Sequence, residues 1–481
     1  MNIGELLERP SVAERRVLEI QTKLHRWAVA DAGRQFKDLF NLVADPAFLV
    51  TAWERVRWNK GARSAGVDGR TARSIEASAG SAEGFLTRLR SDLKDRSFRP
   101  LPVRQRKIPK ANGKLRSLGI PTVRDRVVQA SLKLVLEPIL EADFDPCSYG
   151  FRPQRRAQDA IEEIRKHAKE TYEWVFEGDI AACFDEIDHT ALMRRLRRRV
   201  TDRRVLALAK AFLKAGLLDE EGVDRNTHTG TPQGGILSPL LANLALGVLD
   251  EHFTQKWREH SNATARMRHR RRGGATYRLV RYADDFVVMV SGTRAHAEAL
   301  YDEVAGILTE AGLRLAADKT TVVHIDEGFD FLGFRIQRLR QRGSDRKLIY
   351  TFPSRKAVTA IKRKVKTATV NKTANMSADK LFRQLGRMTR GWGLYFRHGA
   401  SSKAYSDLQH FLWWRVWKWL RKKHPHRPAK WIISQYYPDK GWWPAYEGVR
   451  LFQPITVTIT RYRYRGTNIP TPWTQRLATP P

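Results

Sequence analysis

Cysteine is scarce in this sequence, which has only Cys147 and Cys183 among 481 residues. The two lie far apart and no Cys-x-x-Cys pair occurs, so cysteines alone cannot build a zinc site. We expect no disulfide either, because a reducing compartment keeps distant thiols free. A disulfide-rich secreted fold and a cysteine-based zinc module are therefore not expected.

Long apolar runs are missing as well. The N-terminal stretch MNIGELLERPSVAERR mixes acids with bases and lacks the apolar centre of a signal peptide. The least charged run, GGILSPLLANLALGVL at 234–249, contains Ser, Pro and Asn and falls short of the roughly 20 apolar residues of a membrane span. The chain is therefore predicted to be cytoplasmic, with no membrane partner.

Acidic residues are too few to balance the basic ones. Asp plus Glu number 51 against 87 Lys plus Arg, which leaves a formal net charge of +36. Hydrophobic residues make up 42% of the chain, so this is a folded protein and not a disordered basic tail. So positive a field repels itself in a compact state, and its commonest partner is nucleic acid.

The shortage of acids is most pronounced in the last third of the chain. Residues 354–430 contain 20 Lys plus Arg and two acids, and nine of the 14 Trp lie at or beyond Trp392. Solvated helices normally intersperse acids for i,i+4 pairing, so this imbalance indicates a basic, aromatic-rich helical region. Four clustered tryptophans fit a helix core as well as a stacking surface, and core is the favoured interpretation: Trp413, Trp414, Trp417 and Trp419.

The pattern of apolar residues divides the rest of the chain. Residues 1–90 are predicted to be helical, with a Gly-rich turn at GARSAGVDGR. From 91 to 345, short β-like runs such as WVFEGDI and YRLVRY alternate with longer helical stretches. The chain is thus predicted to belong to the α+β class.

Two adjacent aspartates stand out in LVRYADDFVVMV at 279–290. The flanks have the β-branched and aromatic content of strands, and ADD is short enough for a tight hairpin turn that brings Asp284 and Asp285 together. Three interpretations compete: solvated turn residues, a helix cap, or ligands for a hard cation. The cap fails because no helical pattern follows, whereas the solvated turn stays open on this motif alone.

A second acidic strand end shifts the balance toward a cation. In EWVFEGDIAACFDEIDH at 173–189, Asp179 follows a predicted strand, and Gly178 would let another backbone approach. Mg²⁺ prefers oxygen ligands, and nucleotidyl transfer uses two such ions. Without metal, clustered carboxylates would repel one another and their pKa values would rise. Asp185 and Asp188 are rival ligands, but their place in the next helical turn favours capping.

These residues carry a resemblance to the reverse transcriptases encoded by bacterial group II introns. Asp179 lies in DIxxxFD, Asp284 and Asp285 in YADD, and TPQGGILSPLLANL occupies 231–244. Further blocks in family order are IPKANGKLRSLGIPTVRDRVVQ at 108–129, SYGFRPQRRAQDAI at 148–161, GLRLAADKT at 312–320, FDFLGF at 329–334, RGWGLYFRHG at 390–399 and the N-terminal block at 40–69. YADD alone would be weak, but nine ordered blocks are specific.

The resemblance implies a right-hand polymerase with an antiparallel palm sheet. Its parts would be an RNA-binding N-terminal extension at 1–90, fingers and palm at 91–345, a helical thumb or maturase domain at 346–426 and a basic DNA-binding region at 427–481. It also implies two Mg²⁺ ions held by Asp179, Asp284 and Asp285, with the Ile180 carbonyl as a further ligand.

The same resemblance outlines a nucleotide pocket. Lys110 and Arg116 would grip the triphosphate from the arms of a hairpin around Asn112-Gly113, although an ordinary turn with surface charge fits this segment equally well. By resemblance, Phe184 is the gate that excludes a 2′-hydroxyl, and its alternative is a core residue. Gln233 would contact the nascent base pair. Lys319 is a candidate general acid, with surface charge as its alternative.

Ser238 and Pro239 are predicted to begin a helix, as its N-cap and first residue.

The expected function is RNA-directed DNA synthesis coupled to splicing of the intron and to its mobility by target-primed reverse transcription. The implied partners are group II intron RNA, an RNA template with a DNA primer, target DNA and deoxynucleoside triphosphates, and a homodimer is left open. The protein would lie in the bacterial cytoplasm, at the nucleoid when bound to DNA. With no cysteine past Cys183, we expect no zinc-binding nuclease domain of HNH type and no DNA cleavage by the chain itself.

Two other functions are alternatives: that of a host-adopted relative that serves defence or DNA repair without an intron, and that of a non-enzymatic splicing factor. Retention of Asp179, Asp284 and Asp285 argues against the second.

Overall fold

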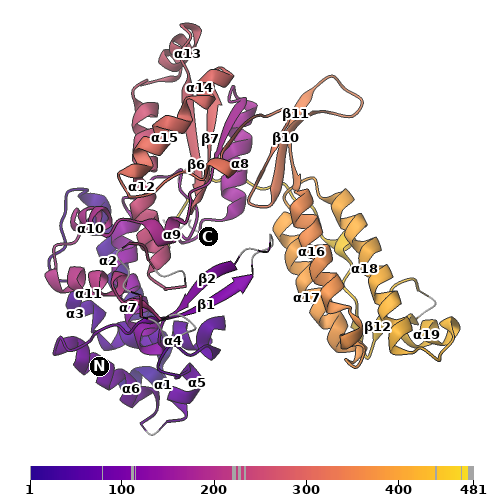
Figure 1. Ribbon diagram of the computed structural model, residues 1–481, viewed down its shortest axis with the longest axis horizontal. Helices are drawn as coiled ribbons and strands as arrows, with labels where there is room; N and C mark the ends of the chain where they lie inside the picture. Colours follow the sequence, from indigo (N-terminus) through magenta and orange to yellow (C-terminus); the bar gives the residue numbers. More distant parts are fainter. Residues whose placement is uncertain are drawn as a thin grey trace, which may run out of the picture. The chain divides into compact units, whose positions relative to one another are not determined.

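The computed structural model describes residues 2–474 apart from 79, 110–112, 114, 219–223, 226–228, 232–233, 439–440 and 467–468 (Figure 1). The chain forms two compact units, each assembled from separate stretches of sequence. Unit 1 comprises Met1–Arg156, Phe176–Thr321 and Gly466–Pro481, and unit 2 comprises Ala157–Val175 and Val322–Arg465. Within the described residues, no helix combines the length and apolarity that a bilayer span needs. The functional boundaries at 90, 345 and 426 stay predictions.

The first part of unit 1 is helical, as the sequence predicts. Asp45 caps α4, with Pro46 at its first position, and Thr122 caps α7 by accepting from the Asp125 N–H. Helices α2, α4 and α7 pack on one another and bury Phe48 and Trp53. The helices are α1 (Ile3–Glu8), α2 (Pro10–Ala30), α3 (Phe40–Val43), α4 (Pro46–Trp58), α5 (Ala72–Glu76), α6 (Ser81–Lys94) and α7 (Val123–Glu141), with the 3-10 helix η1 (Lys60–Arg63).

A four-stranded sheet in the order β2-β1-β4-β5 carries the predicted hairpin. Strands β1 (Val103–Pro109) and β2 (Leu115–Ile120) pair antiparallel with Ile108 opposite Arg116, which confirms the hairpin. Short strands β4 (Leu217–Leu218) and β5 (Asp224–Arg225) complete the sheet. Lys110 and Asn112 lie outside the described residues.

A second four-stranded sheet, in the order β6-β7-β3-β8, positions the aspartates. Strands β6 (Thr276–Tyr282) and β7 (Asp285–Ser291) form an antiparallel hairpin, and β3 (Trp174–Gly178) lies beside β7. Both predicted strands of LVRYADDFVVMV are therefore confirmed. Helix α12 (Ser238–Arg258) packs on β6 and on α15 (Leu300–Thr309). The other elements here are α9 (Cys183–Glu186), α10 (His189–Arg197), α11 (Arg203–Leu213), α13 (Ala263–Arg271), α14 (Arg294–Glu298), η2 (Ala317–Lys319) and β8 (Thr321–His324).

The start of α12 differs by one residue from the prediction. Leu237 is the N-cap and makes no side-chain capping bond, so Ser238 is the first helical residue and Pro239 the second. The Ser238 hydroxyl instead accepts a hydrogen bond from the Thr231 hydroxyl at 2.7 Å. This tertiary contact draws the serine side chain away from the helix end.

Unit 2 combines a small sheet with a helical bundle. Helix α8 (Ala157–Lys169) packs on β11 in a sheet of order β11-β10-β9. In the bundle, Val365 and Ala368 of α16 belong to the core, while Arg363, Lys364 and Lys366 of the same helix are exposed. The elements are β9 (Phe329–Phe331), β10 (Phe334–Arg340), β11 (Lys347–Pro353), α16 (Arg355–Ala368), η3 (Asn371–Thr373), α17 (Ala378–Phe396), α18 (Ser402–Lys423), α19 (Ala429–Tyr436), β12 (Ala445–Tyr446), β13 (Val449–Arg450) and η5 (Pro454–Thr456).

The four clustered tryptophans of α18 divide between core and surface. Trp419 is 1% exposed in the bundle core, and Trp413 and Trp417 pack against that core. The core interpretation is confirmed for these three and wrong for Trp414, which is 44% exposed. Helix periodicity separates them, since four tryptophans within seven positions cannot all face one side.

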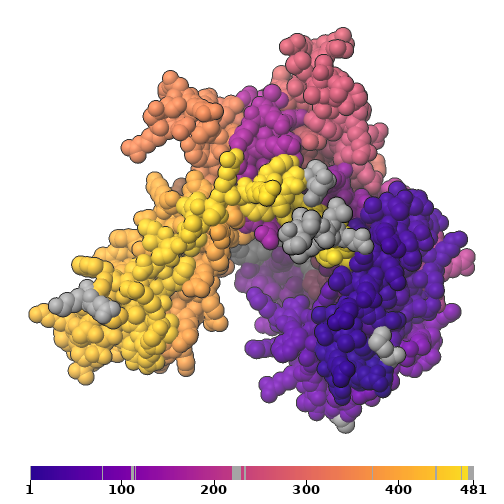
Figure 2. Space-filling view, turned by 180° about the vertical axis from the view of Figure 1, so that it is seen from behind, coloured from indigo at the N-terminus to yellow at the C-terminus, as the bar shows by residue number. Residues whose placement is uncertain are grey.

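The C-terminal segment of unit 2 runs along α8 (Figure 2). Tyr462 donates its hydroxyl hydrogen to Asp159 at 2.9 Å, and Arg465 binds the same carboxylate. Tyr464 donates to Glu163 at 2.5 Å. Burial raises the pKa of Glu163, but the hydrogen bonds from His167 and Tyr464 lower it by more. The net result is a pKa of about 2.

These bonds predict acid sensitivity in unit 2. Because the folded pKa of Glu163 lies below its unfolded value, its stabilisation is complete above about pH 5 and is lost as the pH falls toward 2. We expect Glu163→Gln to destabilise unit 2 by about 3 kcal/mol at pH 7 and by about half of that at pH 3. Thermal unfolding followed by tryptophan fluorescence at both pH values measures this, and a difference independent of pH would contradict it.

Candidate active site

Asp179 stands at the end of β3, directly after Gly178. A Cβ at Gly178 would lie 2.1 Å from the Phe286 ring of β7, so the glycine admits an aromatic ring and not the backbone that the sequence suggested. The chain then enters the short helix α9. Asp188 caps α10 by accepting from the Ala191 N–H at 2.7 Å, as predicted. The capping prediction is wrong for Asp185, which lies inside α9, where Ala182 is the N-cap.

Asp284 and Asp285 form the tip of the β6–β7 hairpin. Tyr282 pairs with Asp285, so Ala283 and Asp284 are the two turn residues. Ala283 has a φ of 59°, the left-handed conformation that a two-residue hairpin turn requires at its first position. A strand follows the pair and not a helix, which confirms that Asp284 and Asp285 are not helix caps.

A buried arginine holds this turn from below. Arg281 is fully buried, and its Nε donates to Asp250 Oδ1 of α12 at 2.7 Å while the pair also forms a salt bridge. The same guanidinium donates to Asn243 Oδ1 at 3.1 Å and to the Ala283 carbonyl at 3.0 Å. Burial disfavours the charged guanidinium, but the Asp250 carboxylate overcomes that effect and raises the pKa of Arg281. The turn is thus fixed to α12 through one ion pair.

Gly150 closes the other side of the turn. A Cβ at this position would lie 2.3 Å from the Ala283 nitrogen and 2.8 Å from the Tyr282 carbonyl carbon, and backbone atoms cannot move aside. Asn243 donates to the Gly150 carbonyl at 2.8 Å, and Tyr149 donates its backbone N–H to the Arg281 carbonyl at 2.8 Å. Neither Gly150 nor Arg281 was singled out from the sequence, although a lone arginine inside the apolar run LVRY was a usable signal.

The aspartates influence one another electrostatically. Desolvation, and then the charges of Asp284 and Asp179, raise the pKa of Asp285 to about 6, although part of this residue is exposed. Burial, and then the charge of Asp284, raise the pKa of the Cys183 thiol to about 12, so this thiol stays protonated. Lys319 pairs with Asp179, and this hydrogen bond raises the lysine pKa. The Lys319 ammonium therefore neutralises the negative charge of Asp179.

The donor set suits Mg²⁺, although the carboxylates are not yet converged. Among the described residues, no three His, Cys, Asp or Glu side chains form a ready-made metal cluster, and Lys319 occupies Asp179. Ala316 donates to the Asp179 carbonyl and Ala181 to the Arg314 carbonyl, and this pattern turns the Ile180 carbonyl away from that strand partner. Oxygen donors that repel one another at the ends of two neighbouring strands fit a hard divalent cation.

The structure places some of the predicted nucleotide-binding residues. Arg116 lies on the exposed arm of β2, and Phe184 is 8% exposed in α9, where its carbonyl accepts from the Thr231 N–H at 2.6 Å. Gln233 lies outside the described residues, as does Lys110. Gly234 packs so closely on β2 that a Cβ would lie 2.4 Å from the Gly119 carbonyl oxygen. The roles of these residues stay predictions.

The buried ion pair yields a test of how the turn is held. Arg281→Met leaves Asp250 and Asn243 without their buried partner, so we expect unit 1 to lose about 3–5 kcal/mol of stability in urea unfolding. The control is the double variant Arg281→Met/Asp250→Leu, which removes both charges and should recover most of the loss. A single variant within about 1 kcal/mol of the parent would contradict the assignment.

Comparison with known proteins identifies both regions of the chain. Residues 108–336 match the reverse transcriptase (RNA-dependent DNA polymerase) family, and residues 358–437 match the group II intron maturase-specific domain. The second match extends past the predicted boundary at 426 and includes α19.

Relatives agree with these matches. Protein YkfC of Escherichia coli (strain K12) is 37% identical over 361 residues, which is 71% of this chain and 93% of that protein. Group II intron-encoded protein LtrA of Lactococcus lactis subsp. cremoris is 32% identical over 355 residues, which is 64% of this chain and 58% of LtrA. A solved telomerase from Candida albicans covers 70% of this chain and 64% of its own, with 13% identity and a TM-score of 0.36, a likeness that adds nothing to the family match.

The resemblance predicted from the ordered motifs is therefore confirmed, together with the α+β right-hand polymerase fold and the helical region that follows it. The aspartates of DIxxxFD and YADD lie inside the matched region. The chain belongs to the group II intron-type reverse transcriptases with a maturase-specific domain, and it is an RNA-directed DNA polymerase.

Proposed function

We propose that deoxynucleotides are joined to a primer at the β6–β7 turn, opposite Asp179. The observation that supports this most strongly is the anchored turn, because Arg281 and Gly150 fix the Ala283 backbone directly before Asp284. Desolvation and the charges of Asp284 and Asp179 raise the pKa of Asp285 at this turn, so a bound cation would be favourable there. Rigid placement of charged groups is what phosphoryl-type transfer demands, since positioning and electrostatic stabilisation supply most of the catalysis.

Asp179, Asp284 and Asp285, with the Ile180 carbonyl, would hold two Mg²⁺ ions. When bound, these supply activation of the primer 3′-hydroxyl and neutralisation of the triphosphate. Lys319, which pairs with Asp179 while no metal is bound, would supply a proton from its Nζ to the departing pyrophosphate. Arg116 and Lys110 would bind the triphosphate oxygens, and Phe184 would lie under the sugar and select deoxynucleotides.

The second activity we propose is assistance to the splicing and mobility of a group II intron. The maturase-specific region carries the basic helices of unit 2, and Lys and Arg on α16 and α18 would neutralise phosphates of the intron RNA. LtrA is named as a group II intron-encoded protein, and this supports the same partner here. Presence of both matched regions favours this function over host defence without an intron and over a non-enzymatic splicing factor.

The polymerase proposal predicts a sharp dependence on Asp284. Asp284→Asn keeps the shape of the turn but removes a negative ligand, so primer extension on an RNA template with Mg²⁺ should fall by at least about a hundredfold. Asp302→Asn, an equal charge change at an exposed position of α15, should leave the rate within about twofold. An Asp284→Asn variant with more than half of the parent rate would overturn the metal assignment.

The maturase proposal predicts which RNA accompanies the protein. Sequencing of RNA that co-purifies from the native host should show enrichment of a structured intron that flanks the coding region. Exposed basic residues of α16 should be needed, so Arg363→Glu/Lys364→Glu/Lys366→Glu should lose about tenfold or more of that RNA. Recovery of unselected cellular RNA by the parent protein would contradict an intron partner.

A further inference from the structure

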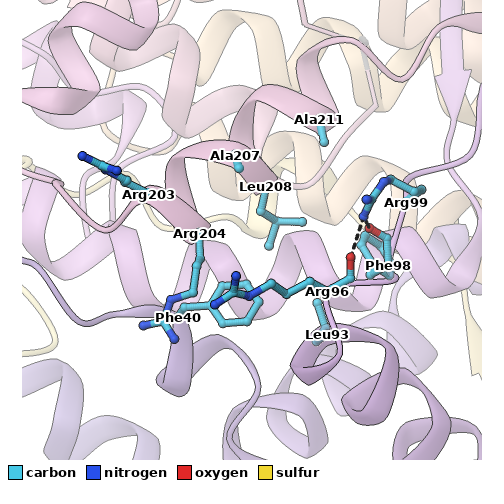
Figure 3. Close-up of a pocket in the computed structure, with 10 residues that line it drawn as sticks. All are labelled: Phe40, Leu93, Arg96, Phe98, Arg99, Arg203, Arg204, Ala207, Leu208 and Ala211. Atoms are coloured by element: carbon cyan, nitrogen blue, oxygen red, sulfur yellow. Dashed lines mark hydrogen bonds between the residues drawn. The ribbon is translucent and has the colours of Figure 1, made fainter.

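A pocket of about 450 Å³ lies in unit 1, away from the catalytic aspartates (Figure 3). Helix α3, the end of α6 with the segment that follows it, and α11 enclose it. Its floor is apolar and includes Phe98 and Leu208, which are 6% and 7% exposed. A volume in the roughly 300–1,000 Å³ range suits a small organic group the size of one nucleotide.

The rim of this pocket is strongly cationic. Four arginines line it, namely Arg96, Arg99, Arg203 and Arg204, and no acidic residue does. Two of them are engaged already: Arg204 pairs with Asp202 and Asp38, and Arg99 donates to the carbonyls of Arg96 and Phe98 at 2.7 and 2.8 Å. Arg96 and Arg203 are exposed, and among the described residues neither side chain has an ion-pair partner. The Arg96 guanidinium, which extends across the pocket toward Phe40, therefore remains for an anion at the edge of an apolar cavity, whereas Arg203 points away from it (Figure 3).

The backbone at Arg96 supports a role for its side chain. Arg96 follows the end of α6 with a φ of 60°, and its N–H bonds the Leu93 carbonyl at 3.2 Å. Glycine is the residue that normally ends a helix in this conformation, because other side chains strain the backbone. Glycine at position 96 would therefore relieve backbone strain. The described contacts of the Arg96 side chain do not explain why an arginine stands there.

An apolar floor beneath a phosphate-binding rim matches the two faces of a nucleotide. Unpaired RNA bases that leave a helix are recognised by stacking on aromatic side chains or guanidinium planes, while arginine binds phosphate bidentately. A paired base cannot enter, because it is held inside the duplex. We propose that this pocket binds one extruded nucleotide of the RNA held by the chain, with the base on the floor and the phosphate at Arg96. This rests on the proposed RNA-binding function.

The first test fills the pocket without changing charge. Ala207 lines the pocket at an exposed position of α11, so Ala207→Trp should occlude it with little cost to folding. The matched control Ala295→Trp puts the same ring on an exposed position of α14. Each full-length protein is titrated against a short RNA hairpin with one bulged 2-aminopurine and against the same hairpin fully paired. The bulged base reports its own burial by fluorescence.

We expect the parent and Ala295→Trp to bind the bulged hairpin about tenfold more tightly than the paired one, with a change in 2-aminopurine emission. Ala207→Trp should lose both the preference and the emission change while it binds the paired hairpin as before. Retention of the preference by Ala207→Trp would overturn the proposal, as would equal loss for both hairpins. The proposal would also be overturned if a Phe-containing acidic peptide displaced the bulged hairpin and excess bulged hairpin could not displace the peptide. The pocket would then serve a protein partner.

A second variant separates binding from folding. Arg96→Gly removes the guanidinium and relieves the positive φ, so its melting temperature should stay equal or rise while the preference for the bulge falls. Arg88→Ala removes an equal charge from an exposed position of α6 that does not line the pocket, and it should keep the preference. If both Arg96→Gly and Arg88→Ala lowered the preference for the bulged hairpin, the effect would come from the overall positive charge. That result would overturn the assignment. The rate of primer extension by Ala207→Trp should match that of the parent. If the parent itself showed no primer extension, only the polymerase proposal would be refuted, and the pocket proposal would stand.

Discussion

The buried ion pair between Arg281 and Asp250 is the constraint on which the geometry of the β6–β7 turn depends. A charged guanidinium inside the palm sheet is costly unless every donor finds an acceptor, and Asp250, Asn243 and the Ala283 carbonyl supply them. Two of these acceptors belong to α12, so the turn that carries Asp284 is tied to a long helix that also packs on β6. The backbone of Gly150 lies against Ala283, so the turn cannot shift toward Gly150.

This rigidity makes sense of an unfavourable cluster of charges. Desolvation is the main cause of the raised pKa of Asp285, and the negative charges of Asp284 and Asp179 add to it. Lys319 offsets the negative charge of Asp179 while no divalent cation is bound. The anchored turn keeps Asp284 in place, whereas a flexible turn would let it move away from the strand end that carries Asp179. The same argument explains why a chain with so large a positive charge keeps its acids here: an anionic substrate needs a cation-binding centre inside a basic surface.

The two units present different features. Unit 1 holds the candidate active site and the arginine-rimmed pocket beside α11, and unit 2 presents basic helices around a tryptophan-containing core. The C-terminal residues take part in both units: Tyr462 and Arg465 bind Asp159 of α8, and Trp473 donates to Gln21 of α2 at 3.2 Å. The basic tail is therefore partly structural, since its side chains satisfy buried carboxylates and polar groups.

Local pattern alone was enough for much of this molecule. β-Branched and aromatic content identified β6 and β7, the pattern of apolar residues identified the early helices, and the motif order identified the family. The three aspartates were recognisable because strand ends and turns are encoded by a few neighbouring residues. The sequence by itself therefore determined the class of fold, the polymerase activity and the place of the acids.

Only the tertiary structure decided which distant residues support those acids. That Arg281 meets Asp250, that Gly150 and Gly178 admit the Ala283 backbone and the Phe286 ring, and that Ser238 bonds Thr231 all depend on contacts between elements far apart in the chain. Packing also decided that Trp419 is core and Trp414 surface, and it assembled the pocket from three separate segments. Periodicity specifies which face of a helix is apolar, but not which partner covers it, because the partner is chosen by complementarity across the whole fold.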